Sequence, residues 1–405
     1  MLNYKKMDKK AVRKILHLDL DAFFCAVEEL KDPSMAGKAF AVGGKAGQRG
    51  VISSCSYPAR RKGVHSAMPT GQALRLCPEL ILISSNFGDY ASKSHEVMAI
   101  LHQLSGLVEQ VSVDEAFVDV TDLPQPVEET ARVLQARVKG ETGLPCSIGA
   151  AANKLVAKIA TDTGKSRSDA PAYPQAILCV PPGSERDFLA PLPVKAMWGV
   201  GPKTEASLAD MGLRTIGDVA NFPADALERR FGKYGTDLHR HALGLDDRPV
   251  TIEYEAKSIS QEVTFARDTT DLAYLRRTLH DLATKVGYRM RCDGVCARVI
   301  RIKLRWPDFT TLTRQAALSA PTDQDGVIAA EAETLLMKIW QHDRPVRLIG
   351  VGGTNLVGQV HQLSLWDTNT EKERKLLTAL DALREKYGKG AVKRGDHVRR
   401  RDGEK

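Results

Sequence analysis

The chain has 405 residues, of which 27% are charged and 43% hydrophobic, a balance that is typical of globular proteins and excludes a wholly disordered chain. Its length predicts roughly two to four domains, and its net charge of +8 favours acidic polymers as partners wherever the positive charges cluster. It has no apolar run of membrane-spanning length, no signal-peptide core and no zinc spacing among its seven cysteines, so we expect a cytoplasmic protein with reduced thiols.

Predicted strands alternate with predicted helices in the first part of the chain. The apolar run at 15–20 is expected to form a strand, and the helix after it is expected to stop at Pro33. Further expected elements are a strand over 80–85 and helices over 92–104 and 129–141. This alternation predicts an α/β or α+β layer.

The texture changes at about residue 181, where short helical segments broken by Gly and Pro predict a separate small helical domain. A linker is expected over 249–258. A second α+β unit is predicted after it, with strands over 259–268 and 296–306 and a helix over 272–290. The final residues, 367–405, predict a helix and a basic end.

Two carboxylates, Asp114 and Glu115, interrupt the apolar stretch 111–120, whose flanks predict two short strands joined by a turn. A solvated hairpin tip is one interpretation, because adjacent negative charges repel. With Asp19, expected near the end of the first strand, they are also the hard oxygen ligands that Mg²⁺ prefers. A pair of metal ions held in this way serves nucleotidyl transfer.

Three further residues are of types that can bind the phosphate groups of a triphosphate. Tyr57 and Arg60 are three apart, so one helical turn would bring both to a single phosphate group. Lys165, expected just beyond a helix, is a suitable point charge. Solvated surface charge is the alternative for each of them.

The Gly-Val-Gly turn before Pro202 is expected to open a helix. The backbone N–H groups of Val200 and Gly201 would then be free to bind a phosphate, with Lys203 beside them. This is the pattern of a helix-hairpin-helix, which grips the DNA backbone without reading sequence. An ordinary Gly-rich connection between helices is the alternative.

Basic residues alternate with apolar ones in the strand predicted over 296–306. Arg301, Lys303 and Arg305 fall on one face, without an acid in the strand's run, and this favours a polyphosphate backbone as partner. A solvated sheet face is the other interpretation. The last motif, QLSLW, comprises Gln362, Leu363, Leu365 and Trp366 around a serine, and is either a strand end or a peptide that fills a partner's pocket.

Taken in order, these segments resemble the Y-family translesion DNA polymerases, in particular the bacterial DNA polymerase IV branch. The resemblance runs from Ile15 through Trp366 and rests on HLDLDAFFCAVE, SYPARRKGV, SVDEAF, AKIATD with Lys165, GVGPKT and QLSLW. It implies a template-directed, low-fidelity DNA polymerase of α+β multidomain architecture, arranged as a right hand. The implied parts are a palm (1–29 and 86–180), fingers (30–85), a helix-hairpin-helix thumb (181–248), the linker (249–258), an α+β little finger (259–361), a clamp-binding peptide (362–366) and a basic tail (367–405).

The resemblance also implies residue roles and partners. Asp19 and Asp114 would bind two Mg²⁺ ions, Glu115 the catalytic ion and the Leu20 carbonyl the nucleotide-side ion. Phe23 and Phe24 would line the nucleotide site, with Phe24 as the steric gate against a 2′-hydroxyl, and Tyr57, Arg60 and Lys165 would hold the triphosphate. The implied partners of this monomer are primer-template DNA, a dNTP and, through QLSLW, a sliding clamp.

The chain departs from the family pattern in two places. Ser166 and Arg167 follow Lys165 where the family commonly has Pro-Asn-Gly, and QLSLW ends in Trp366 with a further tail behind it. Two other functions share part of this pattern: that of a catalytically silent member that acts as a DNA- and clamp-binding scaffold, and that of a palm-type nucleotidyl cyclase. The scaffold would lack a catalytic acid, and the cyclase would not need the thumb motif or the basic stripe.

Overall fold

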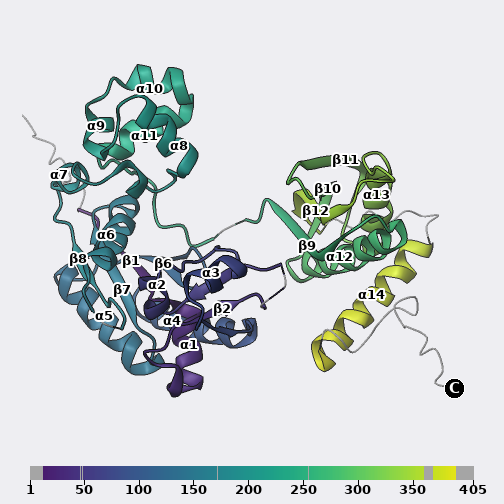
Figure 1. Ribbon diagram of the computed structural model, residues 1–405, viewed down its shortest axis with the longest axis horizontal. Coiled ribbons are helices and arrows are strands. Elements are labelled where there is room, and N and C mark those ends of the chain that lie inside the picture. The colour runs from purple at the N-terminus through teal and green to yellow at the C-terminus, as the bar shows by residue number, and fades with distance from the viewer. Residues whose placement is uncertain are drawn as a thin grey trace, which may run out of the picture. The chain divides into compact units, whose positions relative to one another are not determined.

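The computed structural model describes residues 12–45, 47, 49–170, 172–253, 255–359 and 368–388. The chain divides into two compact units, Met1–Tyr254 and Glu255–Lys405 (Figure 1). In the described part of the chain, no helix is both long and apolar enough to cross a membrane. The predicted clamp-binding residues Gln362, Leu363, Leu365 and Trp366 lie outside the described residues.

The first unit is built around a five-stranded sheet with the strand order β5-β6-β1-β7-β8. The strands are β1 (Ile15–Leu20), β5 (Val108–Gln110), β6 (Glu115–Asp119), β7 (Cys146–Ala151) and β8 (Ile177–Cys179). The expected strand over 15–20 is confirmed as β1, which pairs antiparallel with both β6 and β7. The hairpin expected within 111–120 was partly wrong, because its first strand ends at Gln110, and the residues up to Asp114 form the turn.

Side chains of β1 alternate between two covered faces of this sheet. Leu16, Leu18 and Leu20 pack in one core with residues of α4 (Phe87–Leu104) and α5 (Val127–Thr142). Ile15 packs on the other face with residues of α6 (Lys154–Arg167). Because strand side chains alternate, His17 and Asp19 share the face of Ile15. The apolar run therefore serves two cores, and its polar members face α6.

Gly149 on β7 allows α6 to lie unusually close to the sheet. A Cβ atom at this position would meet the Ala157 carbonyl oxygen at 2.1 Å and the Thr161 nitrogen at 2.5 Å. Gly149 is the strand partner of His17, whose ring nitrogen Nδ1 lies 2.9 Å from Thr161 Oγ1. The missing side chain thus brings α6 within reach of the polar residues on β1 and β6.

A smaller layer follows β1 in the chain. Helix α1 (Phe23–Lys31) ends before Pro33, as expected, and leads to η1 (Pro33–Met35). A three-stranded sheet of order β3-β2-β4 packs with two short helices around a core of its own. Its elements are β2 (Phe40–Gly43), β3 (Ile52–Cys55), β4 (Ile81–Ile83), α2 (Tyr57–Arg61) and α3 (Thr70–Leu76).

A cluster of short helices follows the five-stranded sheet, at the top of Figure 1. It contains α7 (Glu185–Leu189), η2 (Val194–Ala196), α8 (Pro202–Asp210), α9 (Ile216–Asn221), α10 (Ala224–Phe231) and α11 (Lys233–Ala242). Leu208 and Leu227 of this cluster share a hydrophobic core with Leu155 and Ile159 of α6. The helices expected after residue 181 are therefore present, but they form part of the first compact unit rather than a separate one.

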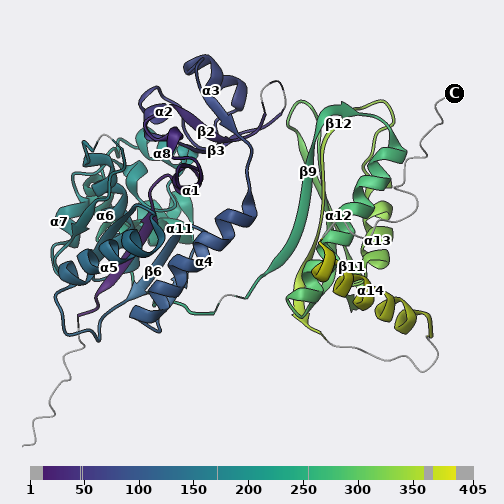
Figure 2. The same cartoon turned by 90° about the horizontal axis from the view of Figure 1, so that it is seen from below.

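The second unit is an antiparallel four-stranded sheet of order β11-β10-β12-β9, with helices α12 and α13 packed on one face (Figure 2). The elements are β9 (Ser258–Thr269), α12 (Leu272–Cys292), β10 (Val295–Arg305), β11 (Thr311–Thr322), α13 (Asp325–Met337) and β12 (Val346–Gly358). The strands and the helix expected between 259 and 306 are confirmed. The second unit is therefore α+β, as predicted.

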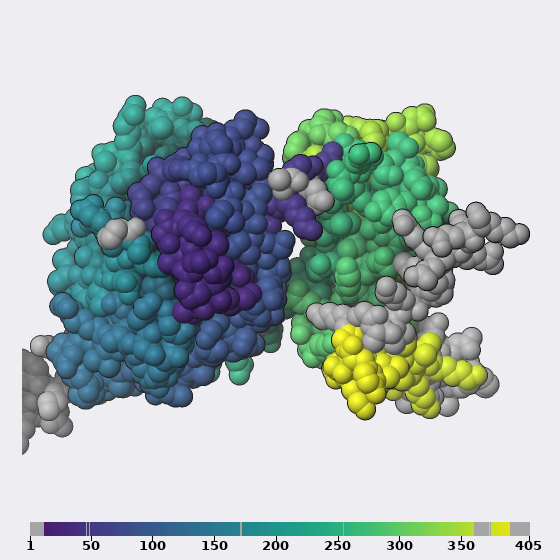
Figure 3. All heavy atoms as spheres, turned by 60° about the horizontal axis from the view of Figure 1, so that its bottom comes forward, coloured from purple at the N-terminus to yellow at the C-terminus, as the bar shows by residue number. Residues whose placement is uncertain are grey.

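The helix expected in the tail is α14 (Thr368–Tyr387), drawn in yellow at the surface of the second unit in Figure 3. The largely buried guanidinium of Arg291 on α12 joins it to the sheet domain, with Nε 2.6 Å from Asp381 Oδ2 and Nη1 2.9 Å from Asp325 Oδ1. Leu377 of α14 is buried as well. The tail thus begins with a docked helix.

Candidate active site

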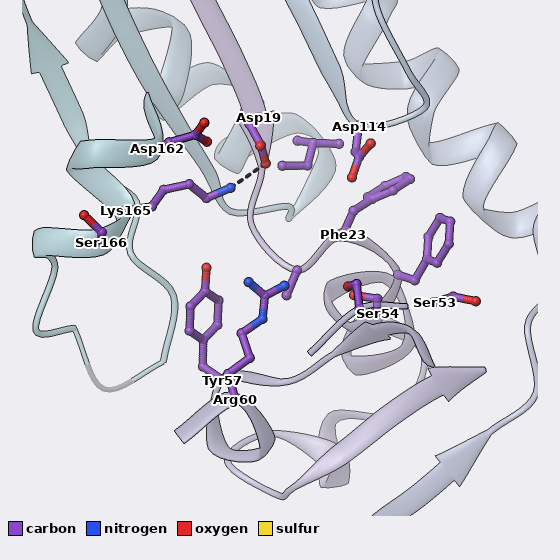
Figure 4. A pocket seen from close by; sticks show the side chains of 14 residues that line it. Asp19, Phe23, Ser53, Ser54, Tyr57, Arg60, Asp114, Asp162, Lys165 and Ser166 are labelled. Atoms are coloured by element: carbon purple, nitrogen blue, oxygen red, sulfur yellow. Dashed lines mark hydrogen bonds and ion pairs between the residues drawn. The ribbon is translucent and has the colours of Figure 1, made fainter. Parts of the chain in front are cut away.

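A pocket of about 460 Å³ lies where β1, β3, α1, α2 and α6 meet in the first unit (Figure 4). It brings together eight residues singled out from the sequence: Asp19, Leu20, Phe23, Phe24, Tyr57, Arg60, Asp114 and Lys165. Its other lining residues, none of which was predicted to act in the site, are Ala22, Ser53, Ser54, Ser66, Asp162 and Ser166. Glu115 does not line the pocket, but it is the strand neighbour of Asp19.

The three predicted metal ligands converge through the pairing of β1 with β6. Asp19 and Glu115 are direct partners in the antiparallel register, and the Leu20 N–H donates to the Asp114 carbonyl at 2.9 Å. Ser112 fixes the turn: its hydroxyl donates to Asp114 Oδ1 at 2.5 Å and accepts from the Glu115 N–H at 3.1 Å. Sequence reasoning missed Ser112, although a hydroxyl two residues before a turn carboxylate is a recognisable signal.

Helix α6 brings a lysine to each of two acids. Lys165 Nζ lies 2.5 Å from Asp19 Oδ1 and 3.3 Å from Asp21 Oδ1. Lys158, two turns earlier, lies 3.1 Å from Glu115 Oε2. The expectation that Lys165 follows a helix was wrong, because α6 continues through Arg167. Lys158 was missed, although its spacing from Lys165 places both on one helix face.

Burial and charge shift the acids in opposite directions. Burial raises the pKa of Asp19 to about 7, and the nearby Glu115 and Asp114 add to the shift that Lys165 offsets only in part. The pKa of Glu115 falls to about 2 through His17, whose Nε2 lies 3.8 Å away, and through Lys158. In this arrangement the charge on Asp19 is the costly one, and a bound cation would stabilise it.

The donor set fits a hard divalent cation. Asp19, Asp114 and Glu115 offer carboxylate oxygens, the type of ligand that Mg²⁺ prefers. Among the residues that the structure describes, no group of three His, Cys, Asp or Glu side chains converges closely enough to hold an ion as placed. Instead, Lys165 contacts Asp19 and Lys158 contacts Glu115, so a bound ion would have to displace these lysines from the carboxylates.

Phe24 and Phe23 differ in their surroundings. The Phe24 ring stacks on Tyr90, with ring centroids 4.2 Å apart and planes 15° apart, and the Tyr90 hydroxyl donates to Glu28 Oε1 at 2.7 Å. Phe24 is therefore held from behind by a buried ring that is itself anchored. Phe23 is 2% exposed and packs in the core beside the pocket.

Tyr57 and Arg60 reach the pocket from α2, on the side opposite Asp19 in Figure 4. The Arg60 guanidinium lies 4.9 Å from the centre of the Tyr57 ring, and its Nε donates to the Cys55 carbonyl at 3.1 Å. Burial raises the pKa of Tyr57 to about 12, so its phenol stays protonated and can donate a hydrogen bond. The helical turn predicted for this pair is confirmed.

The Gly-Val-Gly turn opens α8, as expected, with Gly201 as the N-cap residue and Lys203 exposed. The prediction that the Val200 N–H is free was wrong, since it donates to the Met197 carbonyl at 3.0 Å. The Tyr234 hydroxyl on α11 donates to the Gly199 carbonyl at 2.9 Å. Helix α11 thereby supports the Gly-Val-Gly turn.

The predicted stripe on β10 has the expected alternation, with Ile300, Ile302 and Leu304 buried on the opposite face. Arg301 is exposed, and Lys303 and Arg305 are half-buried. An acid from another strand lies beside the stripe: Glu262 of β9 is 2.8 Å from Lys303 Nζ. It reaches across β12 because the residue between them in register is Gly350. Contact of this stripe with DNA stays a prediction.

Comparison with known proteins identifies related sequences and folds. The impB/mucB/samB family matches residues 18–162, its C-terminal domain matches 256–365, and the HHH motif of the IMS family matches 182–213. A Y-family DNA polymerase chimera of Dbh and Dpo4 has the same fold, with 24% identity and a TM-score of 0.75 over 85% of this chain and all of its own. The insertion ternary complex of Dbh DNA polymerase gives a TM-score of 0.61 at the same identity and coverage.

Curated relatives match over almost the full length. DNA polymerase IV of Dehalococcoides mccartyi strain CBDB1 is 40% identical over 396 residues, covering 97% of this chain and 99% of its own. DNA polymerase IV 1 of Bacillus subtilis strain 168 is 37% identical over 399 residues, covering 96% and 94%. The chain therefore belongs to the Y-family DNA polymerases, in the DNA polymerase IV branch.

Proposed function

We propose that the chain is a low-fidelity, DNA-directed DNA polymerase that carries out translesion synthesis with two Mg²⁺ ions. The observation that carries the site assignment is the pairing of β1 with β6, which makes Asp19 and Glu115 strand partners beside a pocket lined by Asp19, Asp114 and Arg60. Family membership supports the polymerase activity. The identity and number of the ions, and the role of each residue below, are parts of the proposal.

In this proposal the acidic side chains hold the metal ions, and the basic side chains and Tyr57 hold the triphosphate. Two Mg²⁺ ions on Asp19, Asp114, Glu115 and the Leu20 carbonyl would supply charge stabilisation for the attacking primer 3′-oxygen and the leaving pyrophosphate. Tyr57 and Arg60, from the side opposite Asp19, and Lys165, from beside Asp19, would bind the triphosphate and align its α-phosphate. Phe24, backed by Tyr90, lies under the sugar and excludes a 2′-hydroxyl. Phe23 shapes the floor of the pocket from the core.

We assign the parts of a right hand to the observed elements. The five-stranded sheet is the palm (1–29 and 86–180), the three-stranded layer the fingers (30–85), and the helical cluster the thumb (181–248). The second unit is the little finger (259–361), joined through the linker 249–258. The start of α8 at Gly201, with Lys203, and the stripe of Arg301, Lys303 and Arg305 would bind primer-template DNA.

The remaining partner assignments rest on the sequence. The polymerase would be monomeric and cytoplasmic. Its peptide 362–366, with Gln362, Leu363, Leu365 and Trp366, would bind a sliding clamp, and the basic tail 367–405 would follow this peptide. Gln362→Ala with Leu363→Ala should remove clamp-stimulated synthesis while leaving extension without the clamp unchanged. An equal loss of both activities would instead make the peptide part of the fold.

The translesion role is tested by primer extension on matched templates. One template is undamaged, and the other carries a single bulky or abasic site ahead of the primer end. We expect the intact chain to extend past the lesion with Mg²⁺ and four dNTPs. Extension on the undamaged template that stops quantitatively before every lesion tested would leave a DNA polymerase without translesion activity. Binding of DNA without any extension would favour the scaffold function.

A further inference from the structure

Asp21, the second acid of the Asp-Leu-Asp motif, is fully buried beside the pocket and is not one of the proposed metal ligands. Its carboxylate accepts hydrogen bonds from the Ser147 hydroxyl at 2.9 and 3.1 Å and from the Gln175 N–H at 2.9 Å. Lys165 Nζ lies 3.3 Å from Oδ1. A buried carboxylate is costly unless it is paired and hydrogen-bonded, and this one is both.

Besides α6, two parts of the fold hold Asp21: the start of β7 and the loop before β8. Ser147 is on β7, where it is the direct strand partner of Asp19. Gln175 lies in the loop before β8 and holds its backbone at a φ of 43° while its N–H meets Asp21. The Asp21 N–H itself donates to the Pro145 carbonyl at 2.9 Å. Asp21 is therefore fixed in position independently of Lys165.

Lys165 has two acidic partners, and they are not equivalent. Asp19 is a proposed metal ligand, so its oxygens would turn to bound ions and its contact with Lys165 would weaken. Asp21 has no such competing role. With metal bound, Asp21 would be the acid that remains to hold the ammonium at the pocket.

We propose that Asp21 is a positioning residue for nucleotide binding: it holds Lys165 toward the triphosphate while Asp19 serves the metal. The inference rests on the triphosphate-binding role of Lys165 in the proposed function. It also accounts for the departure from the family's Pro-Asn-Gly. Here α6 continues through Ser166 and Arg167, whose backbone remains helical, and the two acids rather than a turn direct the Lys165 side chain.

The test compares Asp21→Asn, Lys165→Met and the double variant in the full chain. Asparagine has nearly the same shape and can still accept from Ser147 and Gln175, so the change removes mainly the charge that faces Lys165. Binding of the correct dNTP is measured on a primer-template with a dideoxy-terminated primer, and KM and kcat are measured on an extendable primer. Affinity for the primer-template alone is measured separately.

We expect Asp21→Asn to weaken dNTP binding and raise KM by roughly tenfold, as the loss of one charged contact implies, with primer-template affinity unchanged. The double variant should bind dNTP no more weakly than Lys165→Met, because both changes act through the same ammonium. Asp225→Asn is the matched control. Like Asp21→Asn, it removes the charge of one carboxylate that has a basic partner, here Arg229 at 2.6 Å on the exposed face of α10. Asp225→Asn should leave dNTP binding unchanged.

Two results would count against the account, and they differ. If Lys165→Met weakens dNTP binding and Asp21→Asn does not, or if the two effects simply add, Asp21 does not act through Lys165. If Lys165→Met itself leaves dNTP binding unchanged, the proposed role of Lys165 fails first.

If the Asp21→Asn variant does not fold, Ser147→Ala is tested in its place. This change removes a hydrogen bond to Asp21 and keeps the ion pair between Asp21 and Lys165. Ser147→Ala should raise KM in the wild-type background and have no further effect beside Lys165→Met, and an equal effect in both backgrounds would overturn the inference.

Discussion

Asp19 and Glu115 are direct partners across the antiparallel strands β1 and β6. Residues that are opposite each other in such a pair have Cβ atoms about 5 Å apart, so two negative charges are held together by the backbone itself. The lysines of α6, Lys158 and Lys165, each face one of these acids. Backbone pairing therefore imposes repulsion between the two carboxylates, and the ammonium groups of the two lysines offset this repulsion.

The charge on Asp19 should destabilise the metal-free fold in a pH-dependent way. Its pKa is about 7 in the folded chain against an ordinary value of 3.8. Between those values the folded chain keeps a proton that the unfolded chain has lost, so this group lowers stability as the pH rises from about 4 to 7. Asp19→Asn should therefore raise the unfolding midpoint at pH 8 in EDTA, and have little effect at pH 4. A difference that is the same at both pH values would contradict the shift.

Lys158 should compete with a cation for Glu115. Its ammonium lies 3.1 Å from the carboxylate, so Lys158→Gln removes a positive charge from the place where an ion would bind. We expect the affinity for Ca²⁺, measured by calorimetry on the chain with primer-template and dNTP, to rise several-fold. Lys93→Gln, which removes a partly exposed lysine paired with Glu96 on α4, is the control. Unchanged or lower Ca²⁺ affinity in Lys158→Gln would show that the lysine does not compete.

Phe24 should determine sugar discrimination. Its ring is supported by Tyr90 at 4.2 Å, so a ribonucleotide's 2′-hydroxyl would meet a side chain that cannot retreat. Phe24→Ala should raise the relative kcat/KM for ribonucleotides by about 100-fold or more, equivalent to roughly 3 kcal/mol. The control Phe309→Ala removes an exposed ring in the second unit. Unchanged discrimination in steady-state incorporation by Phe24→Ala would remove the assignment.

Gly149 should be intolerant of a side chain. A Cβ atom would overlap the Ala157 carbonyl oxygen at 2.1 Å, so α6 must shift and carry its lysines with it. We expect Gly149→Ala to destabilise the fold by about 1–3 kcal/mol in denaturant titrations and to lower activity as well. Gly140→Ala on α5, where a Cβ would meet nothing within 4 Å, should be neutral or stabilising. Equal stability of both variants would mean that α6 does not depend on this close approach.

Tyr234 should support DNA binding by the thumb. Its hydroxyl holds the Gly199 carbonyl at 2.9 Å, next to the turn that opens α8. Tyr234→Phe keeps the ring and removes this hydrogen bond, so affinity for primer-template should fall a few-fold at constant salt. Unaltered affinity, with unaltered salt dependence, would make the contact irrelevant to DNA.

Local patterns in the sequence predicted most of the elements and the identities of the pocket residues. Asp19, Asp114 and Arg60 could be singled out because each lies in a motif whose spacing already implies a strand end, a turn or a helical turn. The contacts of Val200 and Lys303 could not. A backbone hydrogen bond to Met197 and an ion pair across Gly350 depend on register and turn geometry, which local composition leaves open.

The supporting roles of three further residues were not predicted, for a related reason. Ser112, Lys158 and Asp21 act through other side chains, and their roles become apparent only when β1, β6 and α6 are brought together. Gly149 is similar, because a glycine in an apolar strand does not reveal which helix lies against it. Long-range packing thus determines how the site is supported, while local motifs determine which groups it contains.

The central claim is that the acids paired across β1 and β6 carry out DNA synthesis. The most direct measurement is primer extension on an undamaged template with Mg²⁺ and four dNTPs, comparing the intact chain with Asp114→Ala combined with Glu115→Ala at equal DNA occupancy. We predict extension by the intact chain and none by the variant, with both bound to DNA. Extension by the variant at the rate of the intact chain would contradict the assignment of these acids.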